Sequence, residues 1–156
     1  MKNTETYERA FLTISVAMLV VFLGALLYAS VVMGITVPTR VGQVDPRTVR
    51  STAPFDTPGL RQLGPDSVEV VILGQAWSFV PNEIRIPAGT HVTFIATSAD
   101  VVHGFALDGT RINMMLLPGE ISRASYRFEE PGEHLLICHE YCGAGHHAMF
   151  GRVIVE

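Results

Sequence analysis

The sequence predicts an all-β Greek-key sandwich or barrel preceded by one N-terminal transmembrane α-helix. Three observations lead to this prediction. A charge-free apolar stretch lies near the N-terminus, short β-branched runs recur between residues 66 and 156, and glycine, proline or aspartate separates these runs. Short strands at such spacing, with no helical period between them, are typical of a sandwich or barrel. A length of 156 residues allows about one domain of this kind.

The N-terminal segment, residues 1–35, is predicted to contain the membrane-spanning helix. Residues 11–35 carry no charged side chain, and a helix needs about 20 apolar residues to cross a bilayer. The alternative is a cleaved signal peptide. The apolar stretch is much longer than the ~7 to 15 residues of a signal-peptide core, and no small-residue cleavage site follows it. We therefore expect an uncleaved anchor surrounded by membrane lipid.

Residues 36–65 are predicted to form a linker or docking segment. They contain five prolines and show no sustained period, and proline is excluded from helix interiors and central strands. We expect this segment to lie on the membrane face or on a partner. Residues 66–156 remain for the folded domain, which is enough chain for one modest core.

The predicted strands of this domain are short and rich in β-branched residues. The clearest are 68–73, 83–86 and 91–96, and residues 87–90 form the expected turn between the last two. Further candidates are residues 101–107, 121–128, 134–138 and 149–155. The loop between the last two predicted strands then contains both cysteines of the chain.

This loop, residues 138–149, also contains histidines and a methionine at close spacing. Cys138 and Cys142 are followed by His146 and Met149. Thiolate, imidazole and thioether are soft donors that favour copper over magnesium, calcium or manganese. The leading hypothesis is a copper site, and the second cysteine supplies a ligand that can bridge two metal ions. Two coppers that share one unpaired electron change geometry little on reduction, which suits electron transfer.

Two other interpretations of the same residues compete with copper. A disulfide between Cys138 and Cys142 would suit an oxidising compartment, but it leaves His146 and Met149 without a role. Zinc binds cysteine and histidine well, although methionine is a poor zinc ligand. Copper accounts for all four residues and is therefore preferred.

A copper loop of this kind needs a second histidine from elsewhere in the chain, and His103 is the candidate. It lies among apolar residues near the start of a predicted strand. An isolated histidine in such a position is more often a buried residue whose ring nitrogens are hydrogen-bonded. Because the loop lacks one ligand of a copper site, we instead assign His103 as that ligand. The remaining histidines are left outside the site: His91, His134, His139 and His147.

The positive charges alone do not orient the helix. Lys2 and Arg9 precede it, whereas Arg40, Arg47 and Arg50 follow it, so the positive-inside rule gives no clear preference. A copper–thiolate site fits the outer, periplasmic or extracellular, face of a bacterial or archaeal plasma membrane. We therefore expect a single-pass protein whose N-terminus is cytoplasmic.

These residues resemble a known family. The loop pattern, with Asp100 and His103 upstream, is similar to the binuclear copper A domain of cytochrome c oxidase subunit II, and the single helix resembles the ba-type branch of haem-copper oxidases. The resemblance implies a cupredoxin-like fold and two copper ions. The implied ligands are the side chains of His103, Cys138, Cys142, His146 and Met149 and the backbone carbonyl of Glu140.

The resemblance also implies roles for residues around the copper centre. Asp100 would support the site through a hydrogen bond, and in many members the carboxylate at Glu140 reaches a magnesium ion shared with subunit I. Trp77, the only tryptophan, resembles the aromatic segment that receives electrons, although a sole tryptophan is most often a packing residue. Glu8 lies where related subunits place a carboxylate at the mouth of a proton pathway; a surface pair with Arg9 is the alternative.

The implied function is that of the electron-accepting subunit of a terminal cytochrome c oxidase. A soluble cytochrome c or another cupredoxin would reduce the copper centre, and electrons would pass to haem in subunit I for oxygen reduction. The formal net charge of −4 would steer a basic donor, but acidity for solubility alone and an apolar docking patch are alternatives, so charge does not identify the donor. No nucleic-acid partner is expected. The alternatives are the copper A subunit of a nitric oxide or nitrous oxide reductase and a membrane-anchored copper carrier.

Overall fold

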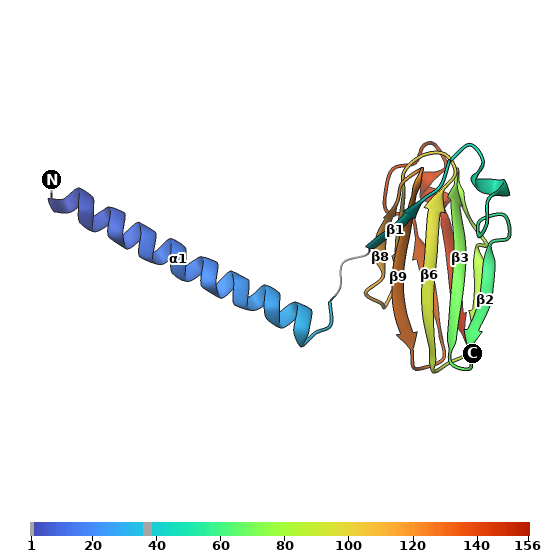
Figure 1. Cartoon of the computed structure of the whole chain (residues 1–156), viewed down its shortest axis with the longest axis horizontal. Coiled ribbons are helices and arrows are strands. Elements are labelled where there is room, and N and C mark those ends of the chain that lie inside the picture. Colours follow the sequence, from blue (N-terminus) through green and yellow to red (C-terminus); the bar gives the residue numbers. More distant parts are fainter. Residues whose placement is uncertain (1, 36–38) are drawn as a thin grey trace. The chain divides into compact units, whose positions relative to one another are not determined.

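The computed structural model describes residues 2–35 and 39–156. The chain divides into two compact units, Met1–Val37 and Pro38–Glu156. The described part of the first unit contains one long α-helix, and that of the second consists mainly of β-strands (Figure 1).

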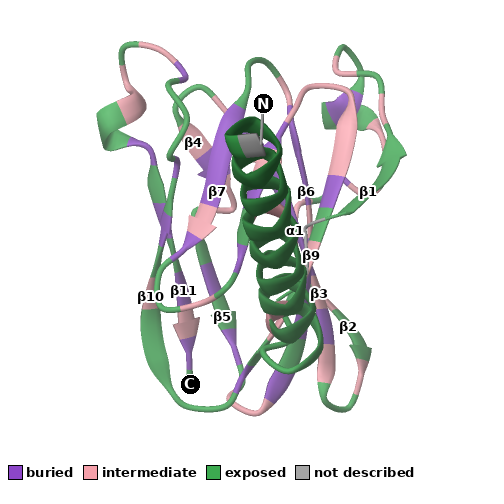
Figure 2. Ribbon diagram, turned by 90° about the vertical axis from the view of Figure 1, so that its left-hand side faces the viewer, coloured by how far each residue is buried: buried purple, intermediate pink, exposed green. Residues whose placement is uncertain are grey.

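Helix α1 (Lys2–Val31) is long and apolar enough to cross a membrane. Figure 2 shows α1 as exposed along nearly all of its length. Its large apolar side chains are exposed, including those of Phe11, Leu19 and Phe22. The helix is followed by Gly34, whose φ of 60° lies in the left-handed region that commonly ends helices. A helix with apolar side chains in all directions is stable where lipid surrounds it, and this observation agrees with the predicted anchor.

The second unit is a sandwich of two sheets. In the part of the chain that the structure describes, the larger sheet has the order β1-β9-β6-β3-β2, with β4 paired to β3, and the smaller has the order β5-β11-β10-β7-β8. The larger sheet contains β1 (Thr39–Gln43), β2 (Gly59–Gly64), β3 (Ser67–Gln75), β4 (Ser78–Val80), β6 (Thr90–Ser98) and β9 (Glu120–Phe128). The smaller sheet contains β5 (Glu83–Ile86), β7 (His103–Leu107), β8 (Asn113–Leu116), β10 (Gly132–Ile137) and β11 (Phe150–Val155).

Alternating side chains of both sheets fill the core between them. In β5, for example, Ile84 and Ile86 are buried while the two charged residues of the strand are exposed. Aromatic side chains from both sheets meet in this core, where the ring of Phe105 lies 5.7 Å from the rings of Phe79 and Phe94. The same cluster includes Cys138, Cys142 and Met149. The predicted metal loop therefore contributes directly to the core.

The structure corrects the prediction that residues 36–65 form a linker. In their described part, β1 pairs with β9 and β2 pairs with β3, so these residues supply two edge strands of the larger sheet. Edge strands tolerate neighbouring prolines because one side of the strand donates no ladder hydrogen bonds. Residues 36–38 lie outside the described part of the chain.

The connection between β1 and β2 covers the second face of the larger sheet. It includes the short helix η1 (Val49–Ser51). Val49 and Phe55 are each 1% exposed and belong to a second buried cluster with Val71 and Leu73 of β3. Strand β3 is therefore covered on both faces, which explains its continuous apolar run.

Candidate metal centre

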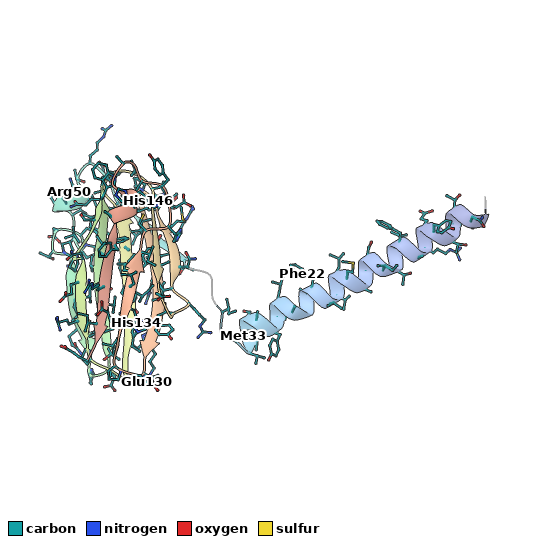
Figure 3. The ribbon with its side chains drawn as sticks, turned by 180° about the vertical axis from the view of Figure 1, so that it is seen from behind. Phe22, Met33, Arg50, Glu130, His134 and His146 are labelled. Atoms are coloured by element: carbon teal, nitrogen blue, oxygen red, sulfur yellow. The ribbon has the colours of Figure 1, made fainter. Side chains whose placement is uncertain are left out.

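The loop between β10 and β11 lies at one end of the sandwich. Figure 3 shows His146 at this end and Glu130 at the opposite end. The strands β10 and β11 are antiparallel partners, and the backbone N–H of Cys138 donates to the carbonyl of Met149 at 3.3 Å. This hydrogen bond closes the base of the loop, so its two ends are held together by the sheet.

The two thiols of the loop lie side by side in a buried position. The Sγ atoms of Cys138 and Cys142 are 3.8 Å apart, and both cysteines are free. A disulfide would place these atoms about 2.05 Å apart. Two sulfurs bound to one tetrahedral metal at about 2.3 Å lie about 3.8 Å apart. The thiols therefore fit a shared metal ion without rearrangement.

One histidine lies beside each sulfur. Nδ1 of His103 is 3.9 Å from Sγ of Cys138, and Nδ1 of His146 is 3.6 Å from Sγ of Cys142. His103 is the fully buried first residue of β7, whereas His146 begins the short helix η2 (His146–Ala148). The ligand atoms of His103 and the two cysteines all lie within 4.8 Å of one another. Folding thus joins the loop to a histidine from a separate strand, as predicted.

Two weaker donors complete the cluster. Sδ of Met149 lies 3.6 Å from Sγ of Cys142, and the backbone oxygen of Glu140 lies 3.3 Å from Sγ of Cys138. Each sulfur therefore has one imidazole nitrogen and one weaker donor close to it. All six positions predicted from the sequence as ligands lie in this cluster.

Asp100 holds the side of the His103 ring that faces away from the sulfurs. Its Oδ1 lies 2.8 Å from Nε2 of His103, so Nδ1 remains the nitrogen that faces the thiols. Burial alone would raise the pKa of Asp100, but hydrogen bonds from the His103 ring and from two backbone N–H groups outweigh it and lower the pKa. Those N–H groups belong to Ala76 and Val101, each 2.7 Å from the carboxylate. A charged carboxylate in this position fixes the tautomer and orientation of a metal-binding histidine.

The metal-free site holds at least one protonated thiol at neutral pH. Burial raises the pKa of Cys142 to about 11, and the hydrogen bond and charge of Cys138 add to the shift. A metal ion must therefore displace a proton when it binds the Cys142 sulfur.

The two outlying candidates differ in their surroundings. Trp77 lies against the metal loop, where its indole N–H donates to the carbonyl of Cys142 at 3.0 Å, and it is 46% exposed. Glu8 is an exposed residue of α1 and belongs to the helical unit.

Of the histidines left outside the site, His134 bonds through Nδ1 to the carbonyl of Asp108 at 2.8 Å. The other three are exposed.

Sequence reasoning missed two contributors to the site. The backbone N–H of Ala76 binds Asp100, and a backbone donor leaves no signal in residue type. The second contributor is the contact of Gly143 and Gly145 with the ring of Trp77, which no local sequence pattern indicates.

Comparison with known proteins identifies the family. A family model for the periplasmic domain of cytochrome c oxidase subunit II matches residues 70–156. The chain belongs to the cytochrome c oxidase subunit II family. Cytochrome c oxidase subunit 2 of Thermus thermophilus is 42% identical to this subunit II over 154 residues, which cover 96% of this chain and 92% of that relative.

Solved structures agree with this assignment. A chain of a haem-copper terminal oxidase dimer, determined by cryo-electron microscopy, matches with a TM-score of 0.80 and 37% identity, covering 96% of this subunit II and 99% of that chain. The periplasmic domain of subunit II of cytochrome oxidase from Bradyrhizobium japonicum matches with a TM-score of 0.53 and 21% identity, covering 56% and 83% respectively. The predicted cupredoxin-like fold with one N-terminal helix is confirmed. This subunit is part of an oxidoreductase, and α1 supplies its membrane anchor.

Proposed function

We propose that this subunit receives electrons at a binuclear copper A centre and passes them to haem in subunit I, where oxygen is reduced. The observation that carries the proposal is the paired arrangement of donors. Two sulfurs lie 3.8 Å apart, and each has its own imidazole Nδ1 within 3.9 Å. A mononuclear blue copper site uses one cysteine and two histidines, and it would leave the second sulfur without a role.

The donors divide naturally between two copper ions. Both thiolates would hold the copper pair. His103 and the carbonyl of Glu140 would complete the ligands near Cys138, while His146 and Met149 would complete those near Cys142. When bound, the copper pair carries the single-electron redox step.

The protein contributes a rigid and dry surrounding for this step. Cys138, Cys142 and Met149 are at most 7% exposed, and His103 is held by Asp100. Ligands that are already in place need little movement when the centre is reduced, and low reorganisation favours fast electron transfer. The exposed side chain of Glu140 is free of a ligand role and would reach a magnesium ion shared with subunit I.

The arrangement in the membrane follows from the anchor and the metal domain. We place the N-terminus in the cytoplasm and the β-domain on the outer face of a bacterial or archaeal plasma membrane. A soluble cytochrome c or cupredoxin would donate electrons there, and Trp77 would receive them because its aromatic ring is exposed and lies close to the metal loop. Similarity over nearly the whole chain to oxidase subunits favours an oxidase over a nitrogen-oxide reductase or a copper carrier.

Copper stoichiometry and electron paramagnetic resonance of the reconstituted chain test this proposal. We expect two coppers per chain and a seven-line signal, because one unpaired electron is shared by two copper nuclei. The Cys142→Ser variant is the control, since one remaining thiolate cannot form the pair. One copper with a four-line signal in the natural chain would establish a mononuclear site. The absence of bound copper would favour the zinc-site or disulfide interpretation instead.

The position of Glu8 on α1 leads to a separate test. If Glu8 lies at the mouth of a proton pathway, Glu8→Ala should slow turnover of the assembled oxidase and leave the copper absorption intact. Glu5→Ala, in the first turn of the same helix, is the matched control. Equal turnover in both variants and the natural enzyme would remove Glu8 from the proton pathway.

A further inference from the structure

The turn between β3 and β4 contacts both halves of the metal cluster. The backbone N–H of Ala76 donates to Asp100 at 2.7 Å, and Asp100 in turn holds His103. The next residue, Trp77, donates its indole N–H to the carbonyl of Cys142 at 3.0 Å. Two adjacent residues of the turn therefore bind two parts of the site. Ala76 binds Asp100, the partner of His103, and Trp77 binds the metal loop.

This turn is itself braced from the opposite side. Nη2 of Arg50, in η1, donates to Oε1 of Gln75 at 2.8 Å. Nε2 of Gln75 lies 3.4 Å from Oγ of Ser78 across the turn. Trp77 thus projects from a hydrogen-bonded turn, so its contacts can restrain the metal loop.

The indole ring lies directly on two glycines of the metal loop. A Cβ atom on Gly145 would lie 2.4 Å from Cδ2 and 2.6 Å from Cγ of Trp77. A Cβ atom on Gly143 would lie 3.0 Å from Nε1, and Gly143 also has a φ of 113°. The backbone approaches the ring at a distance that only glycine permits.

Restraint of these glycines extends to the ligands that follow them. The N–H of His146 donates to the carbonyl of Gly143 at 3.0 Å, and the N–H of Ala148 donates to that of Gly145 at 3.0 Å. The peptide groups that lie on the ring therefore accept the hydrogen bonds that form η2. The orientation of η2 determines where the His146 ring lies relative to the sulfur of Cys142.

We propose that Trp77 is a positioning residue that holds the loop from Cys142 to Gly145 in its metal-binding conformation before the metal binds. The inference rests on the proposed copper function and gives Trp77 a task separate from receiving electrons. A residue that only receives electrons needs an exposed aromatic ring close to the centre. It needs neither the N–H bond to Cys142 nor the glycine contacts.

Amide hydrogen exchange in the metal-free, full-length chain tests this role directly. Trp77→Phe keeps a flat ring and removes the N–H donor, whereas Trp77→Ala removes both. We expect the amides of His146 and Ala148 to exchange about 2- to 10-fold faster in Trp77→Phe, the effect of one lost hydrogen bond, and faster still in Trp77→Ala. Phe150→Ala, which removes a half-exposed aromatic at the other end of the loop, should leave both amides unchanged. Unchanged exchange in both Trp77 variants would overturn the proposal.

A double-mutant cycle tests the contact between the ring and the loop. Gly145→Ala should speed exchange in the natural background, because the new Cβ atom collides with the indole. In the Trp77→Ala background the collision is absent, so the same substitution should add little. Equal effects of Gly145→Ala in the two backgrounds would show that the ring does not restrain the loop.

Copper release separates this inference from the proposed function. In the copper-loaded chain, Trp77→Phe should release copper to a chelator about 2- to 10-fold faster and shift the copper hyperfine splitting. If the natural chain binds no copper, the proposed function fails, and the exchange measurements still decide the role of Trp77. If copper binds and the Trp77 variants change donor oxidation alone, Trp77 is an electron contact and the positioning role is refuted.

Discussion

Gly104 and His139 lie so close together that a Cβ atom on Gly104 would be 2.6 Å from both Cγ and the backbone nitrogen of His139. Gly104 follows His103 on β7, and His139 follows Cys138 at the start of the metal loop. The segments that carry the proposed ligands His103 and Cys138 are thus in direct contact at Gly104. This contact sets the spacing at which Nδ1 of His103 lies 3.9 Å from the sulfur of Cys138.

Gly104→Ala should therefore destabilise the domain and disturb the metal site. A clash with a backbone atom cannot be relieved by a side-chain rotation, and overpacking of this kind costs about 1 to 3 kcal/mol. Urea unfolding of the metal-free chain measures the change. Gly132→Ala is the matched control, because nothing lies within 4 Å of the added Cβ atom there. Equal losses of stability in the two variants would show that the close approach at Gly104 is unimportant.

Asp100→Ala should weaken copper binding without unfolding the domain. The carboxylate fixes the ring of His103 through its bond to Nε2, and the loss of such a partner typically lowers metal affinity about 10- to 100-fold. Competition with a copper chelator measures the dissociation constant. Asp66→Ala removes an exposed carboxylate from the turn between β2 and β3 and serves as the control. The same affinity in the Asp100 and Asp66 variants would show that His103 needs no such support.

The stability of the metal-free chain should fall at high pH because of Cys142. Burial, followed by the Cys138 thiol, raises its pKa from 9.0 to about 11. The folded protein therefore retains a proton that the unfolded chain releases above pH 9. The stabilisation is complete below pH 9 and is lost as the pH rises towards 11. We expect the free energy of unfolding in urea to decrease between pH 8 and pH 11.

Cys142→Ser provides the control for this pH dependence. Serine does not titrate in this range, so the variant should lose less stability between pH 8 and pH 11 than the natural chain. An identical decrease in both proteins would assign the pH dependence to other groups.

The metal loop could be predicted from the sequence because most of its donors are close in the chain. Cys138, Cys142, His146 and Met149 lie within one connection between strands, and their soft chemistry indicates copper. His103 required a further argument from the incomplete ligand set. The structure places it beside Cys138. The need for one more copper ligand therefore pointed to a residue that hydrophobic periodicity alone could not identify.

The strands were predictable where they alternate or form long apolar runs, and not elsewhere. The predicted segments 83–86 and 121–128 correspond closely to β5 and β9. Strand β4 was missed because it has only three residues, and β8 was missed because its residues, Asn113–Leu116, do not alternate between polar and apolar side chains. The contact of Trp77 with Gly145 was also missed, since no local pattern joins residues so far apart in the sequence.

The connection from β1 to β2 was misread because its prolines indicate irregular structure. Proline does exclude a central strand, but β1 and β2 are edge strands. A signal of the covering segment was present in β3, where four consecutive apolar residues (70–73) are buried. A strand that is apolar on both faces needs cover on both faces, and only residues outside the predicted domain remained to supply it.

The buried position of Phe55 therefore predicts that residues 39–64 belong to the folding unit. Phe55 is 1% exposed and packs in the cluster with Val71 and Leu73, so Phe55→Ala should reduce the free energy of unfolding by about 3 to 5 kcal/mol. Leu63→Ala, at a residue that is 61% exposed, should change it by less than about 0.5 kcal/mol. Urea unfolding monitored by circular dichroism compares the two variants.

Two fragments extend this prediction to the whole segment. Residues 39–156 should unfold cooperatively, because they retain both edge strands and the cover over β3. Residues 66–156 should not. Removal of β1 and β2 takes away one of the two neighbours of β9 and the partner of residues 67–71 of β3, and removal of the covering segment exposes Val71 and Leu73 to water. A cooperative transition at the same urea concentration in both fragments would mean that the segment is an appendage, and would restore the interpretation of residues 36–65 as a linker.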